Sequence, residues 1–189
     1  MRKNLLWRVT ACLIPFLAGC ALNRNSITAA GTTTSKPAQN PNLIKNGDFD
    51  CSLENWLTIG QEKNPFHPDD PGRAVFRIKK GMLEVEIKDQ GISIWSVMLY
   101  QSIPFEKGAT YDVSFDAKSD SETQIISNVA EDVTWTNLSG DKKFRLTHVM
   151  SSYSYQFIMS KDGAALFQLC LGMAGTGKIY IDKIVMRKK

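Results

Sequence analysis

The sequence predicts an all-β fold, a β-sandwich of two antiparallel sheets, over residues 42–189. Short stretches of alternating apolar and polar residues recur along this region, and Gly, Asp, Asn and Pro residues separate them. Apolar periodicity of the helical kind is nearly absent. About ten short strands without intervening helices favour two packed sheets, and the 148 residues of this region are enough to bury a core.

The clearest strand is predicted at 110–118, where Tyr111, Val113 and Phe115 share one face and polar residues share the other. This pattern is typical of a strand with one buried face. Residues 82–88 alternate in the same way. Further strands are predicted at 43–49, 73–79, 92–103, 122–130, 143–149, 153–159, 165–172 and 177–187.

The chain begins with a basic and then an apolar segment. Three basic residues among the first eight precede the apolar run 9–17, which has the order of an export signal and is too short for a permanent membrane span. The motif Leu-Ala-Gly-Cys that ends at Cys20 resembles a bacterial lipobox, which implies cleavage before Cys20 and attachment of lipid to it. Residues 1–19 are therefore predicted to be a lipoprotein signal peptide; the alternative is a core helix that happens to contain a cysteine.

Residues 20–41 are predicted to form a lipidated, flexible linker. They are rich in Asn, Ser, Thr and Gly and offer little apolar surface to bury. The linker would hold the sandwich off a membrane to which only the lipid is attached. We therefore expect an extracytoplasmic lipoprotein, on the outer membrane or at the cell surface.

The charge balance gives no reason to expect a nucleic-acid partner. The chain has 23 basic and 19 acidic residues, and removal of the three basic residues of the signal peptide leaves 20 against 19. With a net charge this close to zero, the chain has no strongly positive electrostatic potential to attract a polyanion such as a nucleic acid. Of the four cysteines, Cys51 and Cys170 lie in the predicted sandwich. The sequence is compatible with a disulfide between them and equally with two separate thiols.

Four segments of the sandwich form an ordered set: 42–50 followed by Trp56, then 81–85, then 95–117, then 167–185. In this order they resemble the CenC-like carbohydrate-binding modules, the group that contains families 4, 9 and 22. The resemblance implies a β-jelly roll whose concave sheet holds a glycan chain. The sequence departs from the family pattern between roughly 119 and 160.

Sugar binding needs flat apolar faces for the rings and amide groups for the hydroxyls. Trp95 and Gln101 share parity within 92–103: both are odd-numbered, so on one strand their side chains would point to the same face. Trp95 could equally belong to the core. Gln168 lies between two apolar residues and should point away from the core, because a buried glutamine would need partners that this pattern does not offer. The resemblance places Gln101 and Gln168 where the family has amide side chains in its cleft.

Further aromatic residues complete the candidate set. Trp135 lies in a polar stretch, where a cleft platform, a loop residue and a partner contact are all compatible with it. Tyr153 and Tyr155 share parity and could line the groove, whereas Trp56 follows the opening turn and is expected in the core. The carbohydrate-binding candidates are therefore Trp95, Gln101, Trp135, Tyr153 and Gln168.

The same resemblance implies a structural Ca²⁺ ion where the opening strand meets the last one. The matching positions are Asp48 and Gly81, through their carbonyl groups, and Asp182, through its carboxylate. Calcium takes six to eight oxygen ligands, and backbone ligands leave no trace in a sequence. The alternative is that Asp182 only caps a bend in the last strand.

The sequence offers no catalytic constellation. Glycoside hydrolysis usually needs two carboxylates facing each other, but Glu84 and Glu86 are explained by a solvated edge and Asp69-Asp70 by a proline-rich turn. We therefore expect a non-enzymatic module that binds a polysaccharide of the β-glucan or xylan class, with separate glycoside hydrolases as accessory partners. The alternatives are a hydrolase built on the same sandwich and a surface interaction lipoprotein without sugar binding.

Overall fold

The computed structural model describes residues 40–62, 64 and 67–189. The predicted signal peptide, Cys20 and nearly all of the predicted linker lie outside the described residues. Within this part of the chain all regular elements are β-strands. No helix there is long and apolar enough to cross a membrane.

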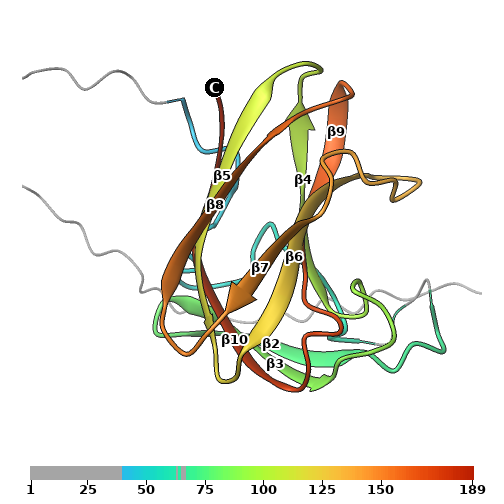
Figure 1. Ribbon diagram of the computed structural model, residues 1–189, viewed down its shortest axis with the longest axis vertical. Helices are drawn as coiled ribbons and strands as arrows, with labels where there is room; N and C mark the ends of the chain where they lie inside the picture. Colours follow the sequence, from blue (N-terminus) through green and yellow to red (C-terminus); the bar gives the residue numbers. More distant parts are fainter. Residues whose placement is uncertain (1–39, 63, 65–66) are drawn as a thin grey trace, which may run out of the picture. The chain divides into compact units, whose positions relative to one another are not determined.

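The strands form two antiparallel five-stranded sheets that face each other as a β-sandwich, which confirms the predicted fold class (Figure 1). Sheet A contains, in spatial order, β1 (Leu57–Ile59), β4 (Met98–Phe105), β9 (Gly163–Cys170), β6 (Thr123–Glu131) and β7 (Lys142–Leu146). Sheet B contains β2 (Arg73–Lys79), β3 (Met82–Asp89), β10 (Gly177–Lys188), β5 (Thr110–Ser119) and β8 (Ser151–Ile158).

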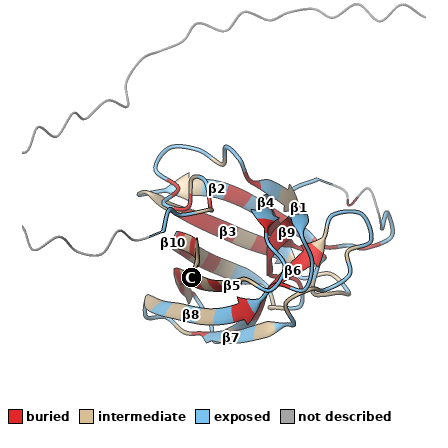
Figure 2. Ribbon diagram, turned by 90° about the horizontal axis from the view of Figure 1, so that it is seen from above, coloured by how far each residue is buried: buried red, intermediate tan, exposed pale blue. Residues whose placement is uncertain are grey.

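One apolar core fills the space between the sheets. Strand β5 shows how the sequence produces it, because Tyr111, Val113 and Phe115 are buried while the residues between them are only partly covered. Figure 2 shows the same alternation of buried and less buried residues along several strands. Burial of one face of each sheet is the main source of stability in such a sandwich.

Trp56 belongs to this core, as the sequence predicts. Its side chain is 6% exposed and packs between Phe49 and Phe167, with ring centroids 5.6 and 6.3 Å away. Its indole Nε1 donates a hydrogen bond to the carbonyl oxygen of Asn46 at 2.9 Å. The Trp56 ring therefore connects residues 40–50, which we call the opening segment, to sheet A.

The opening segment runs along the last strand instead of forming the strand predicted at 43–49. Leu43 N donates to Met186 O at 2.8 Å, and Ile184 N donates to Gly47 O at 3.0 Å. A Cβ atom on residue 47 would lie 2.1 Å from the Ile184 carbonyl oxygen. Only glycine permits this close approach of the two backbones.

Two strands of sheet A differ from the prediction near the site: one begins later than predicted, and one was not predicted at all. Strand β4 begins at Met98 rather than at residue 92, because residues 90–97 form a loop. The short strand β1 has only three residues, too few for an alternation pattern to be recognised. Both differences change which residues face outward from sheet A.

Candidate functional site

A cavity of about 530 Å³ lies on the outer face of sheet A, and we call it the main cavity. Its size is within the range of small-ligand sites in proteins. Side chains from four neighbouring strands (β1, β4, β9 and β6) and three loops line it. They include Met98, Asn128, Gln168 and Cys170 on the floor and Trp95 and Trp135 at the rim.

The sheet register brings the floor together. Gln168 on β9 pairs with Tyr100 on β4 and with Asn128 on β6, so the three side chains form one row across the outer face. The adjacent row is apolar and forms a small cluster separate from the main core. It contains Ile59, Met98, Ile126 and Cys170.

Two amide groups on the floor have unused hydrogen-bonding capacity. Gln168 is 4% exposed and Asn128 is 5% exposed. Within the described part of the chain, neither Nε2 of Gln168 nor Oδ1 of Asn128 has a hydrogen-bond partner, whereas Nδ2 of Asn128 donates to Asp141 Oδ1 at 2.8 Å. An unsatisfied buried polar group costs about 1–3 kcal/mol. The floor thus offers one donor and one acceptor, which a hydroxyl group can satisfy together.

Two aromatic rings line the same cavity as these amides. Trp95 is 45% exposed, and its ring centroid lies 6.4 Å from that of His67. Trp135 packs edge-on against Tyr100, with centroids 5.7 Å apart and an angle of 71° between the rings. Flat apolar faces next to polar groups suit a ligand that is itself amphipathic, such as a sugar ring.

The loop that carries Trp95 is fixed from beneath by Asp70. Ser96 Oγ donates to Asp70 Oδ2 at 2.5 Å and accepts a hydrogen bond from Ser93 N at 2.9 Å. The other carboxylate oxygen of Asp70 accepts from Gly72 N at 2.9 Å. Because the loop is held by these bonds, Trp95 loses little freedom when a ligand contacts it.

Gln101 does not line the main cavity, which corrects the expectation that it lies in the cleft. Strand β4 starts after Trp95, so the parity argument does not carry across the loop. Gln101 shares the inner face of β4 with Leu99 and Ile103. Its Oε1 accepts from Lys45 N at 2.8 Å and its Nε2 donates to Lys45 O at 3.0 Å. Gln101 therefore joins the opening segment to sheet A.

Tyr153 also lies away from the main cavity, which is a second correction. It belongs to β8 in sheet B, its ring stacks on Phe115 at 5.5 Å, and its hydroxyl donates to Arg145 O at 2.9 Å. Tyr155 lies within hydrogen-bonding distance of Ser127 Oγ, at 2.7 Å, and burial raises the pKa of its hydroxyl. Parity showed correctly that the two tyrosines share a face, but that face packs against the core.

Other lining residues escaped the sequence analysis. The polar ones are Asn64, His67, Asn128, Thr134, Asn137 and Asp141. The position of Asn128 could have been predicted from the sequence. Ile125 and Val129 of β6 face the core, and because side chains alternate along a strand, residue 128 faces outward. The others lie in loops, where no periodicity shows the direction of a side chain.

Cys170 is part of the cavity floor and forms no disulfide with Cys51. Cys51 is exposed in the loop before β1, whereas Cys170 is buried beside Met98, with the two sulfur atoms 3.8 Å apart. Burial and the charge of Asp141 raise the pKa of the Cys170 thiol to about 12. The thiol is therefore an apolar floor group at neutral pH.

The positions expected to bind calcium converge in part. The bond from Ile184 N to Gly47 O brings the opening segment beside the bulge that follows Asp182 in β10. Burial and the charges of Asp48 and Asp116 raise the pKa of Asp182. The hydrogen bond that its carboxylate accepts from Lys183 N, at 2.8 Å, lowers this pKa but does not offset the increase. Among the described residues, no cluster of three or more His, Cys, Asp or Glu side chains suits a metal ion. A cation here would rely on backbone carbonyl groups.

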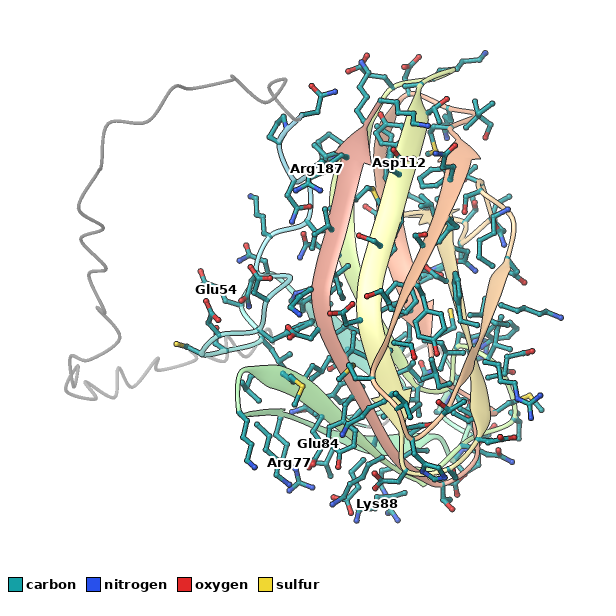
Figure 3. All side chains as sticks on the ribbon, turned by 60° about the vertical axis from the view of Figure 1, so that its left-hand side comes forward. Glu54, Arg77, Glu84, Lys88, Asp112 and Arg187 are labelled. Atoms are coloured by element: carbon teal, nitrogen blue, oxygen red, sulfur yellow. The ribbon has the colours of Figure 1, made fainter. Side chains whose placement is uncertain are left out.

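The outer face of sheet B carries ion pairs. Glu84 accepts from Arg77 Nε at 3.0 Å and from Lys79 Nζ at 3.1 Å. Figure 3 shows Arg77, Glu84 and Lys88 together at one end of the sheet. Burial opposes ionisation of Glu84, but Lys79 and Lys178 outweigh it and lower its pKa. Glu84 is therefore buried beneath Arg77 and Lys79, and not on a solvated edge as expected from the sequence. Its carboxylate forms ion pairs within sheet B.

Residues 41–175 match the family described as carbohydrate-binding domain, of types 4 and 9. The match spans more than half of the chain, so the chain belongs to this family, and the predicted resemblance is confirmed. Among curated proteins, none matches the chain closely enough to count as a relative.

Solved structures share the fold. A family 4 carbohydrate-binding module has a TM-score of 0.69 at 22% identity, over 77% of this chain and 99% of its own. The second N-terminal cellulose-binding domain of Cellulomonas fimi β-1,4-glucanase C has a TM-score of 0.64 at 16% identity, over 82% and 99%. A family 61 module solved with β-1,4-galactotriose has a TM-score of 0.54 at 15% identity, over 79% and 99%.

Proposed function

We propose that this chain binds a polysaccharide of the β-glucan or xylan class without catalysing its cleavage. The observation that supports this most directly is the floor of the main cavity, where Gln168 Nε2 and Asn128 Oδ1 have no partner among the described residues. They line the same cavity as Trp95, which is 45% exposed. Hydroxyl groups of a sugar would satisfy both amides while the ring face of the sugar covers the indole.

The charges around the main cavity favour an uncharged ligand. In the part of the chain that the structure describes, none of its lining residues is a lysine or an arginine, and Asp141 is the one carboxylate. Asp141 Oδ1 accepts hydrogen bonds from Asn128 at 2.8 Å and from Asn137 at 2.6 Å. A single carboxylate used in this way does not provide the pair that glycoside hydrolysis usually requires. The cavity therefore suits binding alone.

We place this binding at the cell surface, on a lipid anchor at Cys20. The export signal and the lipobox-like motif support this location. The main cavity would hold a polymer near the cell, where separate glycoside hydrolases could act on it. The membrane would contact the protein through the lipid only.

Affinity electrophoresis tests the proposed function. The chain should migrate more slowly through at least one gel that contains xylan, mixed-linkage β-glucan or mannan than through a gel without polysaccharide. Trp95→Ala should restore part of the mobility, because it removes an exposed stacking surface from the rim of the main cavity. Equal mobility of parent and variant in all gels would contradict a glycan site in the main cavity.

We further propose that the opening segment and the last strand bind a structural Ca²⁺ ion. Asp48 and Asp182 carry like charges that interact, and neither forms an ion pair within the described residues. Gly81 lies in the turn immediately before β3, and Leu83 of that strand pairs with Ile181, so Gly81 lies at the end of β3 that is nearest to Asp182. Carboxylate and carbonyl oxygens are the ligands that calcium prefers.

Addition of Ca²⁺ to the chelator-treated protein should raise its melting temperature. At one hundred times the dissociation constant the gain is about 2.7 kcal/mol, or roughly 5–10 °C for a domain of this size. Asp182→Asn should abolish the shift, whereas Asp120→Asn, an exposed aspartate beyond the end of β5, should retain it. A calcium shift of equal size in both variants would argue against a role for Asp182.

A further inference from the structure

Trp95 borders two cavities rather than one. It also lines a second hollow of about 250 Å³, which we call the side hollow. Both Trp95 and His67 line the main cavity and the side hollow. The side hollow is lined by His67, Pro68, Asp69, Ile92, Ser93 and Trp95, together with the buried Asp70.

The side hollow repeats the chemistry of the main cavity. Ile92 is 70% exposed and provides an apolar surface beside the ring of Trp95. Asp69 is exposed and supplies carboxylate oxygens that can accept hydrogen bonds from hydroxyl groups. Asp70 is not available for this purpose, because both of its oxygens accept hydrogen bonds from within the protein.

The side hollow is too small to be an independent site. Its volume of about 250 Å³ is about half of the 530 Å³ of the main cavity and lies below the usual range for small-ligand pockets. Its connection to the main cavity through Trp95 and His67 suggests an extension of that site. Its walls are also firm, because Asp70 holds Ser96 and thereby the loop that contains Ile92 and Trp95.

We propose that the side hollow is an additional subsite of the main cavity, which takes the next sugar unit of a glycan after the chain crosses the ring of Trp95. This inference rests on the proposed function. It assigns to Ile92 and Asp69 a role in selecting longer chains. Short oligosaccharides would fill the main cavity alone, and longer ones would gain affinity by reaching the side hollow.

Isothermal titration calorimetry with a ladder of oligosaccharides tests this subsite. The probes are cello-, xylo- and manno-oligosaccharides of two to six units, and the protein is the full chain. For the parent, affinity should rise with length. Ile92→Ser should lower the affinity for the longest probe that binds about fivefold, through loss of apolar contact, and leave the affinity for the shortest unchanged. Ile158→Ser is the matched control, because Ile158 is 66% exposed on β8 and lines neither cavity.

The outcomes separate the two proposals. If the parent binds oligosaccharides but Ile92→Ser shows the same affinity at every length, the subsite is overturned while the proposed function stands. A uniform loss at all lengths would also overturn it, since Ile92 would then act on the main cavity. If the parent binds none of the probes and no polysaccharide gel retards it, both proposals fail.

Discussion

Gln168→Leu is expected to weaken polysaccharide binding by about five- to twelvefold and, at the same time, to raise the melting temperature. The first effect follows because Nε2 of Gln168 is the unpartnered donor on the cavity floor, and loss of a buried hydrogen bond to a ligand costs about 1–1.5 kcal/mol. The second follows because an apolar side chain of similar volume removes the unsatisfied Nε2 from a site that is 4% exposed, and the only bond lost among the described residues is the weak one from the Cys170 thiol to Gln168 Oε1, at 4.0 Å. Stability and binding should thus move in opposite directions.

Gln101→Leu is the matched control, since Gln101 is also 4% exposed but faces the core. Its amide bonds both backbone groups of Lys45, so its loss should lower the free energy of unfolding by about 1–3 kcal/mol and leave glycan affinity unchanged. Thermal melts and calorimetry on the two variants measure both quantities. If Gln168→Leu instead destabilises the protein and binds as tightly as the parent, Gln168 is a structural residue.

Trp56→Ala is expected to lower the free energy of unfolding by about 3–5 kcal/mol. The ring packs between Phe49 and Phe167 and its Nε1 holds the Asn46 carbonyl, so truncation opens a cavity and leaves a carbonyl without a partner. This is a large part of the 5–15 kcal/mol that typically stabilises a domain. Urea denaturation followed by fluorescence measures the loss.

Trp95→Ala provides the contrast for the same substitution. Its ring is 45% exposed at the rim of the main cavity, so stability should change by less than about 1 kcal/mol while glycan affinity falls roughly thirtyfold. Comparable destabilisation by Trp56→Ala and Trp95→Ala would show that the Trp95 loop belongs to the folding core.

The sequence predicted the sandwich well because alternation reports burial directly. The buried face of β5 followed from alternation, and the core position of Trp56 was also predicted correctly. Gln168 points away from the core as predicted, but it is buried on the cavity floor with its Nε2 unpartnered, which the sequence argument did not expect. Parity failed where it had to cross a loop, as from Trp95 to Gln101. It also could not say which face of β8 is buried, and this misplaced Tyr153.

The rest of the candidate site depends on contacts between distant segments. Asn128 meets Gln168 only because β6 pairs with β9, and sheet order does not follow from local pattern. Similarly, Asp70 supports the Trp95 loop across 26 positions through a single hydroxyl of Ser96. Such pairings are set by the packing of the whole domain, so only the structure reveals them.

The two ends of the described domain lie next to each other. Asn40 Nδ2 donates to the carbonyl oxygen of Lys188 at 2.6 Å, and Leu43 and Asn42 bond to the same last strand of sheet B. The main cavity opens on the outer face of sheet A, the other layer of the sandwich. A sensor chip or a fused reporter attached directly before residue 40 or after residue 189 should therefore leave the entrance of the main cavity unobstructed.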